Sequence, residues 1–213
     1  MPSPFASGFV KICGVTTVDD GAFVARSGAT ALGLNLATAS PRRVSLESAR
    51  EIAASTQGAL LRFAVFRGRD DEAILADLDD LDVDVVQLHD VLSTSLLNEL
   101  RARTLLVVKA LSVEGSDFLD FDDRQVDAVL LDGPSPGSGD EHSWLRLKER
   151  RFEVPVIAAG GLTPSNVADV IESTSVNGVD CASGVEQRPG QKEHGLVSSF
   201  VLNARRAFAS REE

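Results

Sequence analysis

Short apolar runs alternate with amphipathic segments along the whole chain. The apolar runs are rich in β-branched residues or leucine and nearly continuous in their hydrophobicity, which is typical of parallel strands buried on both faces. The pattern predicts eight strands, at residues 9–13, 30–36, 60–66, 84–89, 105–111, 127–132, 154–161 and 177–184.

The segments between these runs predict helices, and several open with a residue suited to the N-cap position. The predicted starts are Thr17 with Asp20 at capping-box spacing, Ser45, Ser93, and Thr163 with Pro164 at the first helical position. A last helix is predicted from about His194.

Strands that are each followed by a helical or short connecting segment make a repeating βα unit. No linker or composition break divides the repeat, so residues 1–213 are expected to form one domain, with 1–8 a loose N-terminal extension. The first βα turn, CGVTT, lacks the Gly-x-Gly-x-x-Gly fingerprint of an open dinucleotide-binding sheet. The chain is long enough for a compact closed barrel. We therefore predict an α/β fold, a single-domain (β/α)8 TIM barrel.

Composition and charge narrow the class of protein. The two cysteines lie far apart, so the sequence has no disulfide framework and no paired metal motif. The N-terminus lacks the features of a signal peptide, and no apolar run is long enough to span a bilayer. A soluble, cytoplasmic protein is expected. The formal net charge of −11 disfavours nucleic acid and anionic membranes as partners.

In a barrel of this kind the active site lies at the carboxyl ends of the strands. Two glycine-bearing turns close the seventh and eighth runs, and their residues are Gly160, Gly161, Ala182, Ser183 and Gly184. Backbone N–H groups in such turns can bind phosphate without a basic side chain. The alternative is that glycine only permits tight βα turns. The repeated pattern favours a phosphate site.

Lys11 and Cys13 are alternate residues of the first strand, so both side chains are expected to face the barrel interior. A buried lysine needs a counter-charge. Its ammonium group favours a thiolate and can bring the pKa of a cysteine toward neutrality. Cys13 is therefore a candidate general base or nucleophile, although a lone cysteine is more often a small core hydrophobe.

Three further residues are candidates by position. Asp132 ends the sixth strand before a Gly/Pro/Ser loop and suits a general acid, or else a structural cap. Arg42 lies in the loop after the second strand, where it can bind a carboxylate or remain a surface residue. His89 ends the fourth strand and either lines the site or belongs to the core. Cys181 is expected to face the helices as a packing residue.

Taken together, these motifs resemble the phosphoribosylanthranilate isomerases of tryptophan biosynthesis over nearly the whole chain. The motifs that carry the resemblance are KICG at 11–14, SPRRVS at 40–45, VQLH at 86–89, LLD at 130–132, AGGLTPSNV at 159–167 and VDCASGVE at 179–186. KICG and SPR are highly specific in combination, whereas GGL before a capped helix is common among phosphate-binding barrels.

The resemblance implies an Amadori rearrangement of N-(5-phosphoribosyl)anthranilate without metal or cofactor. By position, Cys13 matches the general base, Asp132 the general acid, and Arg42 the residue that binds the anthranilate carboxylate. The backbone around Gly160, Gly161, Ala182 and Ser183 matches the phosphate site. The expected partner is therefore a small phosphorylated substrate, and the chain is expected to be a monomer or a homodimer.

The chain departs from the family pattern in three places. Asp90 and Val91 follow VQLH in place of glycine and an acidic residue, PGSGDEHSW replaces the usual loop after the sixth strand, and Ala182 replaces a serine. The alternatives are a related histidine-pathway phosphosugar isomerase, a dual-substrate version, or a paralogue that binds a metabolite without turnover. The histidine-pathway enzyme ends its first strand with an aspartate, so Cys13 argues against it.

Overall fold

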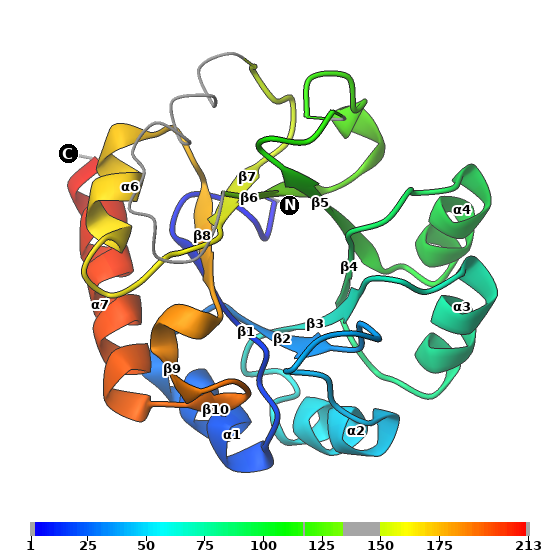
Figure 1. The fold of residues 1–213 in the computed structure, drawn as a ribbon, viewed down its shortest axis with the longest axis horizontal. Coiled ribbons are helices and arrows are strands. Elements are labelled where there is room, and N and C mark those ends of the chain that lie inside the picture. Colours follow the sequence, from blue (N-terminus) through cyan, green and yellow to red (C-terminus); the bar gives the residue numbers. More distant parts are fainter. Residues whose placement is uncertain (1–2, 117, 134–149, 212–213) are drawn as a thin grey trace.

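Eight parallel strands close into a barrel in sequence order (Figure 1). The computed structural model describes residues 3–116, 118–133 and 150–211. Pairing of the first strand with the eighth, with Lys11 beside Asp180, closes the ring and confirms the predicted barrel. The strands are β1 Phe9–Cys13, β2 Ala31–Asn35, β3 Leu61–Phe66, β4 Val85–Leu88, β5 Leu106–Ser112, β6 Ala128–Asp132, β7 Val156–Ala159 and β8 Gly178–Cys181.

Helices surround the barrel in Figure 1. They are α1 Val18–Ser27, α2 Leu46–Ser55, α3 Asp71–Asp79, α4 Thr94–Ala102, α6 Val167–Ser173 and α7 His194–Arg211, with 3-10 turns η1 Asp123–Gln125 and η3 Ser183–Val185. A small antiparallel hairpin, β9 Glu186–Arg188 and β10 Gln191–Lys192, follows η3. None of the helices in the described ranges is long and apolar enough to cross a membrane.

The predicted N-caps at Thr17, Ser45 and Ser93 are confirmed, because each side chain accepts a hydrogen bond from the backbone N–H three residues later. The capping box is not reciprocal, however. The carboxylate of Asp20 accepts hydrogen bonds from a different part of the chain, near the start of α7.

The predicted start of α6 at Thr163 is wrong. The Asn166 side chain accepts a hydrogen bond from the Thr163 N–H at 2.7 Å and donates one to the Gly161 carbonyl at 3.0 Å. The Thr163 hydroxyl pairs with Ser165 Oγ at 2.9 Å instead of accepting from a backbone N–H, and the helix begins at Val167 after a turn.

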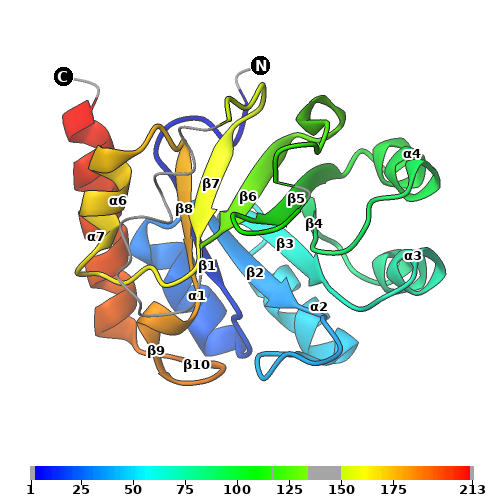
Figure 2. The ribbon, with the colours of Figure 1, turned by 45° about the horizontal axis from the view of Figure 1, so that its top comes forward.

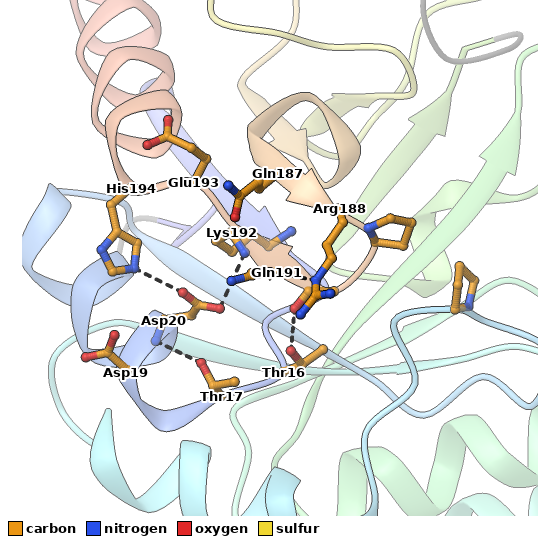
Figure 3. Close-up of a pocket in the computed structure, with 13 residues that line it drawn as sticks. Thr16, Thr17, Asp19, Asp20, Gln187, Arg188, Gln191, Lys192, Glu193 and His194 are labelled. Atoms are coloured by element: carbon orange, nitrogen blue, oxygen red, sulfur yellow. Dashed lines mark hydrogen bonds and ion pairs between the residues drawn. The ribbon is translucent and has the colours of Figure 1, made fainter.

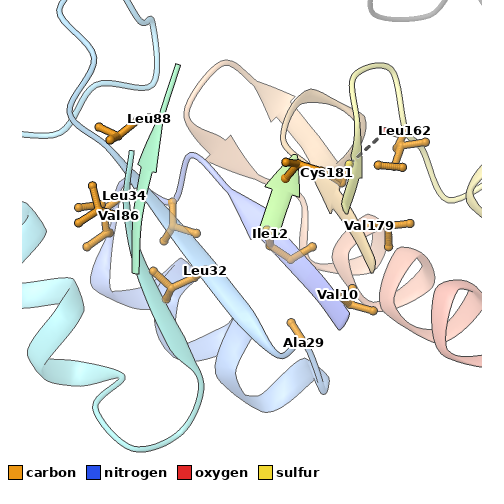
Figure 4. Close-up of a cluster of buried hydrophobic side chains, with 14 of the residues drawn as sticks. Val10, Ile12, Ala29, Leu32, Leu34, Val86, Leu88, Leu162, Val179 and Cys181 are labelled. Carbon is orange, nitrogen blue, oxygen red and sulfur yellow. Dashed lines mark hydrogen bonds between the residues drawn. The ribbon is translucent and has the colours of Figure 1, made fainter. Parts of the chain in front are cut away.

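Alternation along the strands divides the hydrophobic core into two layers. Outward-facing side chains such as Ile12, Leu32 and Val179 pack beneath the helices (Figure 4). Inward-facing side chains fill the barrel, among them Phe63 and Leu130. Each fully buried side chain of this size stabilises the fold by about 1.5–3 kcal/mol relative to leaving it exposed.

The described part of the N-terminal segment is packed against the barrel rather than loose. Phe5 is fully buried and makes edge-to-face contacts with Phe9 and Phe63, with ring centroids 5.4 and 6.2 Å apart. Figure 2 shows the described N-terminal segment, in dark blue, at the end of the barrel opposite the β9–β10 hairpin. The expectation of a loose extension therefore fails for Phe5, because its ring fills the end of the barrel away from the candidate site.

Candidate active site

Lys11 and Cys13 both face the barrel interior, as their alternation on β1 predicts. The space for the thiol comes from Gly33 on the neighbouring strand β2. A Cβ atom at Gly33 would lie 2.7 Å from Cys13 Sγ and 3.2 Å from Lys11 Cε. A side chain on this residue of β2 would therefore displace the candidate base.

The counter-charge that Lys11 requires is Asp180 on β8. Lys11 Nζ donates a hydrogen bond to Asp180 Oδ2 at 2.8 Å, and the lysine is completely buried. Asp180 Oδ1, also buried, has no hydrogen-bond partner among the described residues. The sequence did not single out Asp180 as a site residue. The available signals were its inward phase on β8 and the need of Lys11 for an anion.

The expected tuning of Cys13 by Lys11 is only partly right. Lys11 and Lys192 do lower the pKa of the thiol, but burial and the Asp180 carboxylate raise it, and the net shift is upward. Burial is the largest effect, because it removes water from the thiolate. The Lys11 charge is opposed by its partner Asp180 and outweighed by burial, so Lys11 alone does not bring the pKa of the thiol to neutrality.

Asp132 is half-buried at the end of β6. Its pKa is raised to about 6, first by burial and then by the negative charge of Asp180, while Lys11 and Arg67 act in the opposite direction. A carboxyl group in this environment holds a proton at higher pH than an ordinary aspartate does. That is the property a general acid needs near neutral pH.

Arg42 is paired with Glu186, the first residue of β9. Arg42 Nε lies 2.8 and 3.0 Å from the two Glu186 carboxylate oxygens, and Arg42 Nη2 lies 2.8 Å from Oε2. The pKa of Arg42 is raised, most strongly by its hydrogen bonds to Glu186, and the Cys13 thiol also raises it. Because the ion pair uses Nε and Nη2, the Nη1 side of the guanidinium remains for a ligand carboxylate. Sequence reasoning did not find Glu186.

His89 follows β4 and is half-buried, with its Nε2 atom 3.0 Å from Gln87 Nε2. Its pKa is lowered to about 4 by burial, and then by the charges of Arg67, Lys11 and Lys109. The imidazole is therefore neutral near pH 7. Arg67, the residue after β3, is exposed and acts electrostatically on both His89 and Asp132, which identifies it as a cation near the site that the sequence did not reveal.

The two glycine-bearing turns lie against each other. Gly160 and Gly161 have φ angles of +85° and +68°. A Cβ atom on Gly184, in the turn after β8, would lie only 2.0 Å from the Leu162 carbonyl oxygen. The close approach requires glycine and brings Ala182 and Ser183 beside the turn after β7. The phosphate role of these turns stays a prediction.

Two remaining predictions concern the loop after β6 and the second cysteine. The PGSGDEHSW segment, with Pro136, His142 and Ser143, lies outside the described residues. Cys181 is 2% exposed in the outer core, where its thiol donates to the Leu162 carbonyl at 3.1 Å (Figure 4). Its predicted role in packing is confirmed.

The fold and the arrangement of these groups define a (β/α)8-barrel enzyme class that places acid and base groups at the carboxyl ends of its strands. Residues 10–203 match the family model described as N-(5'-phosphoribosyl)anthranilate (PRA) isomerase. The chain belongs to this family.

Individual relatives span nearly the whole chain. The N-(5'-phosphoribosyl)anthranilate isomerase of Rubrobacter xylanophilus is 37% identical over 202 residues, covering 92% of this chain and 98% of the relative. The solved structure of TrpF from Jonesia denitrificans has a TM-score of 0.83 at 32% identity, covering 92% and 96% of the two chains. A solved phosphoribosyl anthranilate isomerase in complex with reduced 1-(o-carboxyphenylamino)-1-deoxyribulose 5-phosphate has a TM-score of 0.75 at 30% identity, covering 92% and 98%.

Proposed function

We infer that this protein is a phosphoribosylanthranilate isomerase of tryptophan biosynthesis, an aldose-ketose isomerase. It rearranges N-(5-phosphoribosyl)anthranilate to 1-(2-carboxyphenylamino)-1-deoxyribulose 5-phosphate. The observation that carries the chemistry is a carboxyl group with its pKa raised to about 6, Asp132, at the same end of the barrel as the Cys13 thiol.

The proposed mechanism consists of proton transfers. Protonated Asp132 donates its proton to the ring oxygen of the ribose, the bond between C1 and that oxygen breaks, and an iminium forms. The Cys13 thiolate then removes the proton from C2 to give an enolamine, which tautomerises to the ketone. Each transfer by a positioned acid or base is worth about a hundred- to ten-thousand-fold in rate.

The remaining groups are assigned to binding. The backbone of Gly160, Gly161, Ser183 and Gly184, with Ala182, would bind the phosphate group of the substrate. Arg42 would bind the anthranilate carboxylate through Nη1 while Glu186 holds the opposite edge of the guanidinium. Lys11, paired with Asp180, would supply the electrostatic environment of the base, and neutral His89 would line the site. The oligomeric state, monomer or homodimer, stays a prediction.

The wild-type protein is expected to consume phosphoribosylanthranilate that is generated in situ, which a fall in its fluorescence would report. The control reaction omits the protein and measures the spontaneous decay of the substrate. Binding of the reduced product analogue without any turnover would contradict the assignment and would favour a paralogue that only binds the metabolite.

Replacing Arg42 with methionine is expected to raise KM about ten- to a hundredfold, with a smaller effect on kcat. The reason is the loss of a charge-assisted hydrogen bond to the substrate carboxylate, worth about 1.5–3 kcal/mol. Steady-state kinetics measure both constants. The matched control is Arg43→Met, because Arg43 is exposed and adjacent in the chain. Equal KM values in the two variants would exclude the carboxylate role of Arg42.

A further inference from the structure

Lys192 is a buried cation that the mechanism above does not use. It belongs to β10, in the hairpin that lies beside α1 and the start of α7 (Figure 3). Its backbone N–H points to Asp20 Oδ2 at 3.4 Å, whereas its side chain is completely buried. Burying an ammonium group is costly unless it is paired and hydrogen-bonded, so the contacts of Nζ deserve an explanation.

The Lys192 ammonium joins three parts of the candidate site. Nζ donates hydrogen bonds to the Cys13 carbonyl at 2.6 Å, the Ala182 carbonyl at 3.1 Å and Glu186 Oε1 at 2.9 Å. The register between β1 and β8 ends at Ile12 and Cys181, so the first two acceptors belong to Cys13, the last residue of β1, and to Ala182, the residue after β8. Two of the three hydrogen bonds therefore bridge the ends of β1 and β8 beside the candidate base, and the third binds Glu186.

Glu186 extends this connection to the substrate-binding arginine. Its carboxylate accepts from Lys192 Nζ and from Arg42 Nε and Nη2, and it also accepts from the Gly190 N–H at 3.2 Å. The pKa of Glu186 is lowered by both cations despite its burial, so the carboxylate is ionised. One anion therefore fixes both the Arg42 guanidinium and the Lys192 ammonium.

The charges around the Cys13 thiol show how the pairing of Glu186 with Arg42 and Lys192 affects the candidate base. They come from Lys11 on β1, Asp180 on β8, Lys192 on β10 and Arg42 in the loop after β2. Lys11 and Asp180 cancel formally, whereas Arg42, Glu186 and Lys192 leave one net positive charge. Lys11 lowers the pKa of the thiol most among these charges, and the group that contains Lys192 adds a net positive charge that also favours the thiolate.

We propose that Lys192 is a positioning residue for the isomerase reaction, which holds the end of β1 that carries Cys13 and couples it through Glu186 to Arg42. The proposal rests on the proposed function for its kinetic consequences. It also predicts a property of the thiol that can be measured without substrate, so the two can fail separately.

The test measures how fast iodoacetamide alkylates the ligand-free protein as a function of pH. Cys181 is buried with its pKa raised to about 12, so the reaction reports Cys13, and Cys13→Ser gives the baseline. Lys192→Met is expected to slow alkylation at pH 7 about tenfold, equivalent to a rise of about one unit in the thiol pKa. The kcat/KM profile should move in the same direction, to higher pH.

Two variants complete the design. Arg188→Met is the matched control, because Arg188 is an exposed cation of the same hairpin and its guanidinium bonds to Gln191. Glu186→Gln leaves the Lys192 ammonium without its counter-charge, so alkylation should shift to lower pH, opposite to Lys192→Met. This variant also decides the matter if Lys192→Met does not fold.

Opposite shifts in the two variants would support the proposal, since a purely structural role predicts no such pair. A lower melting temperature with an unchanged pH dependence of alkylation would overturn it. So would an unchanged profile in Glu186→Gln. The two variants could shift the pH dependence of alkylation as expected while the protein shows no isomerase activity. That result would uphold the positioning of the thiol and reject the proposed function.

Discussion

Replacing Cys13 with serine is expected to lower kcat/KM by about a hundred- to ten-thousand-fold, the range for loss of a general base. Serine keeps the size and position of the side chain, but its hydroxyl does not ionise in the accessible pH range. Because the pKa of the wild-type thiol is raised, the thiolate is the minor form near neutral pH. The substitution removes the thiolate entirely. Fluorescence assays of substrate consumption, extended to high enzyme concentration, would measure the loss.

The matched control is Cys181→Ser, because the second cysteine lies in the outer core and its thiol donates to the Leu162 carbonyl. A serine hydroxyl can donate to the same acceptor, so activity should stay close to wild type. A kcat/KM close to wild type in Cys13→Ser would rule out the thiolate as the base. A similar loss in both would indicate a general effect on packing.

The sequence predicts that Lys11 and Cys13 on β1 face the barrel interior, but it does not identify the residues of other strands that they contact. Strict alternation on β1 places Lys11 and Cys13 on the same face, and apolar character identifies the strand itself. Asp180 is 169 residues away in the chain, and its pairing with Lys11 exists only because β8 closes the barrel on β1. The sequence indicates that Lys11 needs an anion, but a single sequence does not show which carboxylate supplies it.

The hairpin that holds Lys192 shows a second limit. β9 and β10 have three and two residues, too short for any periodic pattern. Nothing local distinguishes Lys192 from a surface lysine, and its burial follows from the position of the hairpin against β1 and β8. The α6 start failed for a related reason. The residues at 163 and 164 have good helix-start chemistry, but the Thr163 hydroxyl pairs with the Ser165 hydroxyl instead of accepting from a backbone N–H.

The two candidate catalytic groups are tuned by one shared environment. Burial and Asp180 raise the pKa of both Cys13 and Asp132, while Lys11 lowers both. Raising the pKa helps an acid hold its proton but hinders a base from losing one. The barrel interior therefore favours the protonated form that Asp132 needs as an acid. Cys13 depends on additional cations to become a thiolate, and one of them, Lys192, donates a hydrogen bond to the Cys13 carbonyl.

Replacing Asp132 with asparagine is expected to lower kcat/KM by about a hundred- to ten-thousand-fold, because the amide cannot donate the proton that opens the ribose ring. The pH dependence identifies the role. A general acid is active while protonated, and the pKa of Asp132 is about 6 in the ligand-free protein. Because the pKa of the Cys13 thiol is raised, the thiolate fraction keeps increasing with pH over the same range. Wild-type kcat/KM should therefore rise with pH up to about 6 and level off above it, where the loss of protonated Asp132 offsets the gain in thiolate. Bound substrate is anionic and disfavours the carboxylate, so the same break in kcat should lie at higher pH.

Two variants test this assignment of the break to Asp132. Arg67 lowers the pKa of Asp132, so Arg67→Gln should move the break in kcat/KM to higher pH by a fraction of a unit, limited by the solvent exposure of Arg67. Asp127→Asn is the matched control. Asp127 precedes the same strand and accepts a hydrogen bond from the Val107 N–H at 2.8 Å, which an asparagine oxygen can also accept. The residual activity of Asp132→Asn should keep rising above about pH 6, because only the thiolate then titrates. If the break at about pH 6 persisted in this variant, another group would be the acid.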